Sequence, residues 1–76
     1  MSAFTLDVKG LTCGHCVASV KEELGEIDGV DTVDVDLNAG EDKVSHARVE
    51  ASKEISDDAI REAINEAGYD LVSINR

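Results

Sequence analysis

The segment "GLTCGHCV", residues 10–17, contains both cysteines of the chain, with Gly14 and His15 between them. Two thiols at this spacing could bind one metal ion together, or they could form and break a disulfide with each other. In both cases the reactive form is the thiolate, so either chemistry depends on how readily the thiols ionise. Cys13 and Cys16 are therefore the candidate site residues, and their surroundings must distinguish the two chemistries.

The elements that position this pair can be predicted from hydrophobic periodicity. In chain order, the sequence predicts strand 4–8, helix 14–24, strand 30–37, a strand within 43–51, helix 57–67 and strand 69–74. This order and length predict an α+β fold of the ferredoxin-like βαββαβ type, with a four-stranded antiparallel sheet and two helices on one of its faces. We expect a single domain over residues 1–76.

Strict alternation predicts which side chains of the two middle strands face the core. The expected inward-facing residues are Val33, Val35, Leu37, Ala47, Val49 and Ala51. Val44 is out of phase with the second set, which predicts either a bulge or a longer hairpin loop near the turn at residues 38–42. The inward face of the last strand cannot be assigned from alternation.

The second helix has clear end signals. Ser56 is a favourable N-cap, and Asp57 and Asp58 place negative charge in the first turn, where the helix dipole favours it. Gly68 is well placed as the glycine that follows the last turn.

The composition excludes several classes of function. The chain has 17 Asp and Glu against 7 Lys and Arg, for a net charge of −10. Nucleic-acid binding needs a basic face, and attraction to anionic lipid needs clustered Lys and Arg, so we expect neither partner. No segment approaches the roughly 20 apolar residues of a membrane span, so we expect no membrane insertion, and no export signal is evident. We therefore expect a cytoplasmic protein, where lone cysteines are more often metal-binding or catalytic than structural.

The predicted fold places Cys13 in the loop after the first strand and Cys16 in the first turn of the first helix. A helix N-terminus has unpaired N–H groups and a partial positive charge, which favour thiolates. Two thiolates form a soft, low-coordinate site that suits Cu(I), Ag(I) or Hg(II). A structural zinc site usually needs four protein ligands, and His46 lies far away on a strand where it should face outward. His15 is the alternative third ligand, although a solvated turn residue is the simpler interpretation.

A redox function is the main alternative to metal binding. Cys-Gly-His-Cys is also the active-site sequence of protein disulfide isomerases, which have thioredoxin folds. Those proteins normally carry an aromatic residue before the first cysteine and a proline facing the pair. Here Thr12 precedes Cys13 and the chain contains no proline. The predicted order of elements also differs from thioredoxin, so the context favours metal binding.

The sequence "GLTCGHC" resembles the G-M-T/S-C-x-x-C motif of heavy-metal-associated domains, a family that includes bacterial copper chaperones and the small domains of copper-transporting P-type ATPases. "VDVDL" and "AINEAGYDL" resemble the family's second strand and its closing helix and strand, so the resemblance covers nearly the whole chain. It implies that Cys13 and Cys16 ligate the metal. Leu11 stands where the family usually has a methionine, which is a core residue under the loop. Tyr69 follows Gly68 where bacterial copper chaperones often carry a tyrosine near the metal loop.

We therefore expect a cytoplasmic copper chaperone, not an enzyme, that binds one Cu(I). Its expected partner is a copper-transporting P-type ATPase or the metal-binding domain of that ATPase, which receives the ion by thiolate ligand exchange. We expect a monomer without metal, with a metal-bridged dimer as the alternative when metal is bound. Two other functions remain open: a detached ATPase domain, against which the positions of Met1 and Arg76 argue, and a dithiol oxidoreductase.

Overall fold

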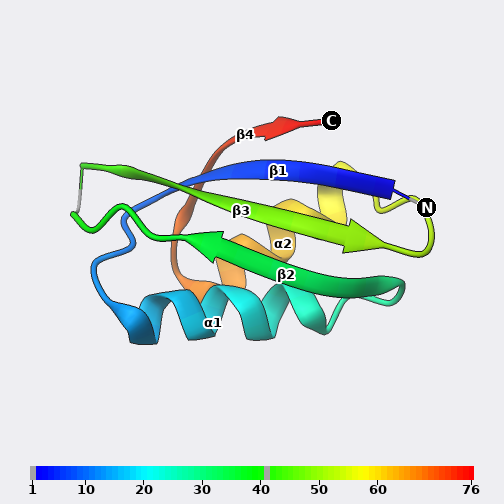
Figure 1. The fold of residues 1–76 in the computed structure, drawn as a ribbon, viewed down its shortest axis with the longest axis horizontal. Helices are drawn as coiled ribbons and strands as arrows, with labels where there is room; N and C mark the ends of the chain where they lie inside the picture. The colour runs from blue at the N-terminus through cyan, green and yellow to red at the C-terminus, as the bar shows by residue number, and fades with distance from the viewer. Residues whose placement is uncertain (1, 41) are drawn as a thin grey trace.

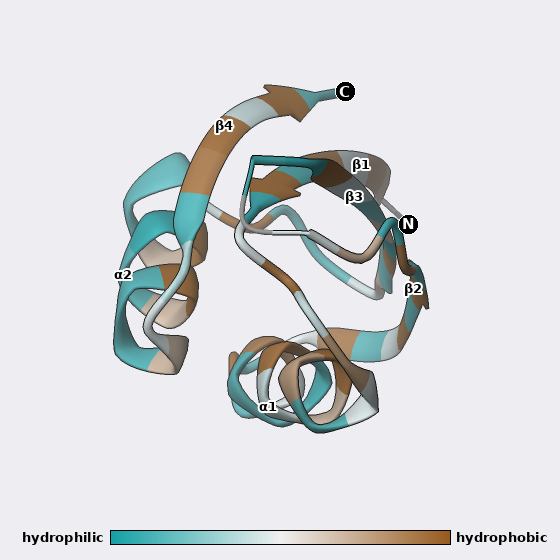
Figure 2. Cartoon of the chain, turned by 90° about the vertical axis from the view of Figure 1, so that its left-hand side faces the viewer, coloured by the Kyte–Doolittle hydropathy of each residue, from teal (hydrophilic) through white to brown (hydrophobic). Residues whose placement is uncertain are grey.

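The helices and strands follow the order expected from the sequence (Figure 1). The computed structural model describes residues 2–40 and 42–76, with β1 (Ser2–Lys9), α1 (Gly14–Gly25), β2 (Val30–Asp36), β3 (Val44–Ala51), α2 (Asp57–Ala67) and β4 (Asp70–Asn75). The strands form one four-stranded antiparallel sheet in the order β2-β3-β1-β4. Both helices lie on the same side of the sheet, as the end-on view in Figure 2 shows. The predicted ferredoxin-like fold is confirmed.

The core lies between the inner face of the sheet and the two helices. On the central strand β1, Phe4, Leu6 and Val8 are at most 4% exposed, and the first two pair with Val49 and Ala47 of β3. The helices contribute the buried residues Val20, Leu24, Ile60, Ala63 and Ile64. Alternation directs every second residue of a strand into this layer, and the inward face predicted for β3 is confirmed.

The connection from β2 to β3 is a long loop, and no bulge lies at Val44. The pairing of β1 with β3 runs in unbroken register to Lys9 and Val44. Ser45 takes the inward position next to Val44 and is fully buried. Its hydroxyl accepts a hydrogen bond from the backbone N–H of Asn38 at 2.8 Å and donates to the Asn38 carbonyl at 3.3 Å. Of the two alternatives that the sequence left open, the longer loop is right.

The inward orientation expected of Leu37 is wrong. β2 ends at Asp36, and Leu37 is 38% exposed. The backbone N–H of Asn38 is bound by the Ser45 hydroxyl, and its side-chain amide donates to the Val44 carbonyl at 3.4 Å. The chain therefore leaves the strand one residue early, and alternation no longer determines where Leu37 points.

The last strand has an irregular inner face because its pairing with β1 contains a register shift between Asp7 and Val8. Leu71 and Ile74 both pack against the core although they are three positions apart, an offset that regular alternation would place on opposite faces. The irregularity explains why strict alternation could not assign this strand.

Helix α2 begins and ends as the sequence predicts. The Ser56 side chain accepts a hydrogen bond from the backbone N–H of Ala59 at 3.2 Å, which makes Ser56 the N-cap. Gly68 follows the last turn in the left-handed region with φ of 90°, where a Cβ would be strained. No helix among the described residues is long and apolar enough to cross a membrane.

The outer face of the sheet carries a hydrogen-bonded cluster around Asp7 that the sequence did not indicate. One carboxylate oxygen lies 2.6 Å from Nδ1 of His46, and the other accepts bonds from Ser73 at 2.6 Å and Asn75 at 3.1 Å. The bonds from Ser73 contribute most, followed by those from His46 and Asn75, and together they lower the pKa of Asp7 below its ordinary value. The cluster links β3, β1 and the edge strand β4.

We predict that Asp7→Asn destabilises the protein at pH 7 and much less at low pH. A carboxyl with a lowered folded-state pKa contributes stability above its unfolded pKa, near 3.8, and loses it as the pH falls through the folded value. Urea unfolding of both proteins at pH 7 and near pH 3 measures this difference. An equal loss of stability at both pH values would show that the charge of Asp7 does not matter.

Candidate functional site

The cysteine loop between β1 and α1 is held from below by Leu11. This side chain is fully buried, although its neighbours Thr12 and Cys13 are exposed. Gly10 has φ of 99°, which allows the chain to turn out of β1 at this point. The role expected of Leu11, a core residue beneath the loop, is confirmed.

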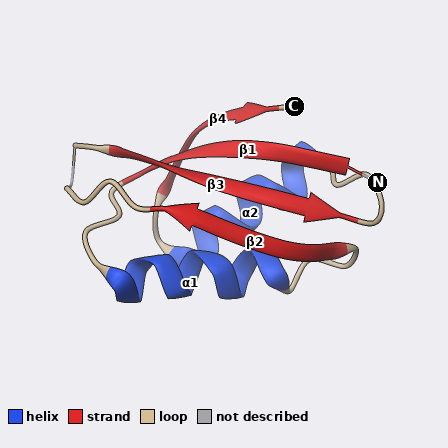
Figure 3. Cartoon of the chain, in the orientation of Figure 1, coloured by secondary structure: helices blue, strands red, loops and turns tan. Residues whose placement is uncertain are grey.

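The long β2–β3 loop also supports the cysteine loop. The backbone N–H of Gly40 donates to the Leu11 carbonyl at 3.0 Å, and that of Gly10 donates to the Lys43 carbonyl at 3.4 Å. Both loops lie at the same end of the molecule (left in Figure 3). Two backbone hydrogen bonds therefore join the β2–β3 loop to the segment that leads into the candidate site.

Cys13 is the N-cap residue of α1, and Cys16 lies in its first turn. The backbone N–H groups of Cys16 and Val17 donate to the Cys13 carbonyl at 3.1 and 3.3 Å, which closes the first turn. The two sulfur atoms are 3.7 Å apart. Both thiols are free, with Cys13 exposed and Cys16 half-buried. The helix start therefore places two sulfurs side by side where unpaired N–H groups favour negative charge.

Polar neighbours of Cys16 stabilise its thiolate form. The Tyr69 hydroxyl makes the largest contribution, followed by the backbone and hydroxyl of Thr12, and together they lower the pKa of the Cys16 thiol to about 6. The Thr12 hydroxyl lies 3.5 Å from the Cys16 sulfur. The same interaction with Cys16, more than burial, raises the pKa of Tyr69 to about 12. Cys16 is therefore largely a thiolate at neutral pH, the form in which a cysteine binds metal or attacks a disulfide.

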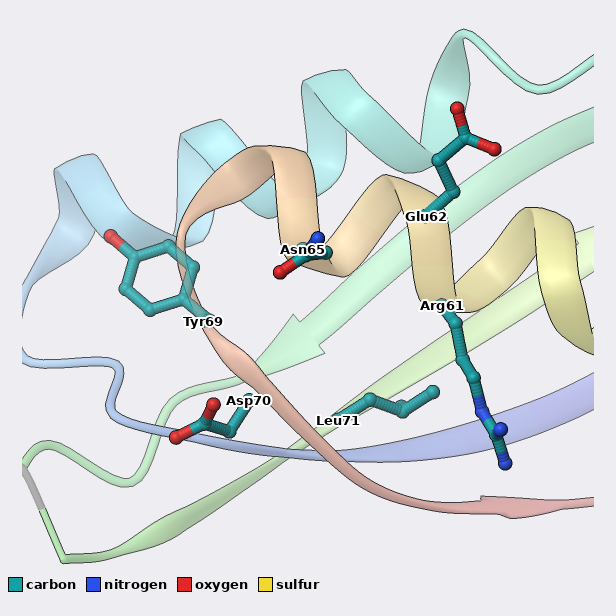
Figure 4. Close-up of a pocket in the computed structure, with 6 residues that line it drawn as sticks. All are labelled: Arg61, Glu62, Asn65, Tyr69, Asp70 and Leu71. Carbon is teal, nitrogen blue, oxygen red and sulfur yellow. The ribbon is translucent and has the colours of Figure 1, made fainter.

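Tyr69 reaches the site from the other end of the chain. The glycine turn after α2 includes a hydrogen bond from the Tyr69 N–H to the Ile64 carbonyl at 3.2 Å. The ring then lies near Gly10, where a Cβ would come within 3.7 Å of it. In Figure 4, Tyr69 stands at one end of a shallow groove of about 410 Å³ between α2 and β4, with its hydroxyl directed toward the side where α1 begins. The proximity of Tyr69 to the cysteine loop is confirmed.

The two histidines lie on different elements of the fold. His15 is exposed on the first turn of α1, and His46 faces outward from β3 and binds Asp7, as expected of an outward-facing strand residue. Within residues 2–40 and 42–76, no three His, Cys, Asp or Glu side chains converge in a geometry that could hold a metal ion.

The sulfur geometry is suited to holding one soft ion. Two metal–sulfur bonds of about 2.3 Å, the length found with zinc, can span up to about 4.6 Å, so sulfurs 3.7 Å apart can share one ion in a bent arrangement and would have to separate for a linear one. A disulfide needs a closer approach, to about 2.05 Å. Rotation of the two side chains could lead either to a shared metal ion or to a disulfide. The similarity to known proteins is therefore needed to favour one of these two products.

A family model for the heavy-metal-associated domain matches residues 5–70. The chain belongs to this family. Copper chaperone CopZ of Bacillus subtilis is 44% identical to this heavy-metal-associated domain over 71 residues, which is 93% of this chain and 97% of the relative. The COP-associated protein of Helicobacter felis is 47% identical over 66 residues, covering 87% and 92% of the two chains.

Solved structures agree with this assignment. A CopZ metallochaperone superposes on this heavy-metal-associated domain with a TM-score of 0.78 at 35% identity, over 93% of this chain and 100% of the other. The yeast copper transporter domain CCC2A gives the same TM-score, 0.78, at 28% identity, over 97% and 94% of the two chains. The family resemblance inferred from the cysteine motif is confirmed.

We predict that Leu11→Ala destabilises the protein by about 2–5 kcal/mol, because a buried leucine leaves a cavity that the loop cannot fill. Leu11→Met should cost less than about 1.5 kcal/mol, since the two side chains have similar volumes. Denaturant unfolding without metal measures both. An unchanged midpoint for Leu11→Ala would contradict the packing role.

We predict that Tyr69→Phe raises the pKa of the Cys16 thiol, because the variant removes the largest stabilising interaction with its thiolate. The alkylation rate of Cys16 should rise with a midpoint near pH 6 when Tyr69 is present, and at higher pH in the variant. The rate is measured with iodoacetamide in a Cys13→Ser background, so that one thiol titrates. Identical midpoints would show that Tyr69 does not act on Cys16.

Proposed function

We propose that this chain, as a single domain over residues 1–76, is a copper chaperone of the cytoplasm that binds one Cu(I) between Cys13 and Cys16. The observation that carries the proposal is the pair of sulfurs, 3.7 Å apart at the start of α1, with Cys16 largely ionised. Soft thiolates are the ligands that Cu(I) prefers. Its relatives in Bacillus subtilis and Staphylococcus aureus are named copper chaperones, which supports copper as the cargo.

The exposure of the pair supports transfer of the ion by ligand exchange. Cys13 is exposed and Cys16 is half-buried, so an incoming thiolate can reach an ion held between them. A new Cu–S bond forms to the partner, one bond to Cys13 or Cys16 then breaks, and repetition moves the ion. Copper stays Cu(I) throughout, and the released thiolate can take up a proton from solvent. The transfer needs no enzymatic chemistry.

The partner that we propose is a copper-transporting P-type ATPase or its metal-binding domain. Support comes from the yeast copper transporter domain CCC2A, which has the same fold and was solved in apo and Cu(I)-loaded states. A donor and an acceptor built alike would hold the ion with similar strength, so transfer could run with small free-energy changes. The same similarity leaves a detached ATPase domain as an alternative. We propose a monomer without metal, with the metal-bridged dimer as the alternative.

The low pKa of Cys16, about 6, favours one function of another class, that of a dithiol oxidoreductase. A readily ionised thiol attacks disulfides efficiently, and Cys13 lies close enough to resolve a mixed disulfide. Reduction of insulin by the dithiol form of this protein separates the two functions. Turnover comparable to that of a thioredoxin would favour the oxidoreductase.

We predict that the reduced protein binds one Cu(I) per monomer and that X-ray absorption shows mainly sulfur neighbours. Cys13→Ser and Cys16→Ser should each weaken binding strongly, because each removes one of two ligands. His15→Ala should weaken it only slightly, because His15 is exposed and is not needed for a two-thiolate site. Competition with a Cu(I) chelator under anaerobic conditions measures all three variants.

Zinc provides the matched control for this prediction. Zn(II) prefers four ligands and would have to recruit water or a second molecule, so equimolar Cu(I) should displace it. Zinc that holds its place, or a His15→Ala loss as large as either serine variant, would replace the copper proposal with a Cys/His zinc site.

A further inference from the structure

The inner face of β3 carries one polar residue, Ser45, among small apolar ones. Ser45 shares this face with Ala47, Val49 and Ala51, and all four are at most 1% exposed. A hydroxyl that is withdrawn from water costs free energy unless it makes hydrogen bonds, and an apolar residue would fill the position without that cost. Packing alone therefore does not explain why a serine stands here.

The Ser45 hydroxyl directs both of its hydrogen bonds to the backbone of one loop residue, Asn38. It accepts from the Asn38 N–H at 2.8 Å and donates to the Asn38 carbonyl at 3.3 Å. The Asn38 side chain adds only a longer bond, at 3.4 Å, from its amide to the Val44 carbonyl. One buried side chain thus fixes both backbone polar groups of a residue that lies just beyond the end of β2.

The loop residue held by Ser45 is close in the chain to the contact with the cysteine loop. Two positions after Asn38, the N–H of Gly40 donates to the Leu11 carbonyl at 3.0 Å, and Leu11 lies two positions before Cys13. Gly40 has φ of 144°, where other residues are strained, so the path between the two anchors is specific. Short chain segments and hydrogen bonds therefore connect the buried hydroxyl to the first sulfur, at the end of the molecule that is on the left in Figure 3.

We propose that Ser45 is a positioning residue for the metal site. Its hydroxyl holds the β2–β3 loop, and the loop holds the backbone from which Cys13 and Cys16 project. Ser45 contacts neither sulfur, so it acts through the hydrogen bond from Gly40 to Leu11. The proposal rests on the proposed function only for the identity of the bound ion, because the link from Ser45 to the cysteine loop exists without metal.

Local opening of the cysteine loop is the motion that this link opposes. Such openings have free energies of their own, which lie below that of global unfolding. An opening that moves the backbone of Cys13 away from Cys16 also separates the sulfurs, and an ion held by two thiolates then loses one of its ligands. Ser45 should therefore set how long a bound ion stays on the protein.

The first test is Ser45→Ala, followed without metal by NMR. The variant keeps a small residue at the buried position, and the exposed Asn38 can bind water instead, so the protein should still fold. Amide exchange with solvent should become about three- to tenfold faster at the N–H groups of Gly40 and Cys16, the range expected for the loss of one hydrogen bond. The first amide reports on the link to Leu11, and the second on the first turn of α1. Unchanged exchange at Cys16 would overturn the proposal.

Two control variants separate positioning from a general loss of stability. Val49→Ala removes a buried side chain from the same face of β3 and none of the loop hydrogen bonds. At equal global stability, adjusted with urea, Ser45→Ala should still exchange faster at Cys16 than Val49→Ala does. Asn38→Ala removes only the longer side-chain bond and should have a much smaller effect than Ser45→Ala. Exchange as fast in either control as in Ser45→Ala would overturn the proposal.

Release of copper gives a second measurement on the same variants. The protein loaded with one Cu(I) is mixed anaerobically with excess chelator, and the release rate is extrapolated to zero chelator. This rate should rise in Ser45→Ala by about the same factor as the exchange at Cys16, and by less than about twofold in Asn38→Ala. An unchanged release rate in Ser45→Ala would overturn the positioning role. Failure of the unaltered protein to bind Cu(I), with the exchange effect intact, would overturn only the copper proposal.

Discussion

The burial of Leu11 is the constraint on which the site depends. An exposed loop of small and polar residues has little to hold it, and one fully buried leucine anchors this loop to the core. Because Leu11 stands two residues before Cys13, its position determines where α1 begins and where both sulfurs lie. The hydrogen bond from Gly40 to the Leu11 carbonyl adds a second fixed point from the β2–β3 loop. The exposed Cys13 and the half-buried Cys16 thus lie on a backbone that is held in place.

The start of α1 then determines the chemistry of the pair. Cys13 is the N-cap and Cys16 is in the first turn, so both sulfurs are near the unpaired N–H groups of the helix. Tyr69 arrives from the turn after α2 and makes the largest contribution to lowering the pKa of Cys16. The fold therefore combines an accessible pair of sulfurs with a built-in preference for the thiolate. At neutral pH, such a site can accept a soft ion with little free-energy cost for deprotonating Cys16.

Charged residues elsewhere on the surface differ in their effect on the stability of the fold. On the outer face of the sheet, Asp7 is satisfied by Ser73, His46 and Asn75, so this carboxylate stabilises the fold. Near the end of α1, by contrast, partial burial and the neighbouring acidic residues raise the pKa of Glu23. The same net charge thus contains stabilising and destabilising parts, which composition alone cannot distinguish.

The sequence by itself determined the order of the elements, most of the core, the caps of α2 and the family, because these depend on local periodicity and on a short contiguous motif. The assignment of Cys13 and Cys16 as metal ligands stays a prediction from that motif. Only the tertiary structure decided that β2 ends before Leu37, that the β2–β3 loop braces the cysteine loop, and that Asp7 gathers partners from two other strands. It also decided that Tyr69 lowers the pKa of Cys16. The physical reason is common to all of these: each depends on residues brought together by packing from distant parts of the chain, and local patterns contain no information on such distances.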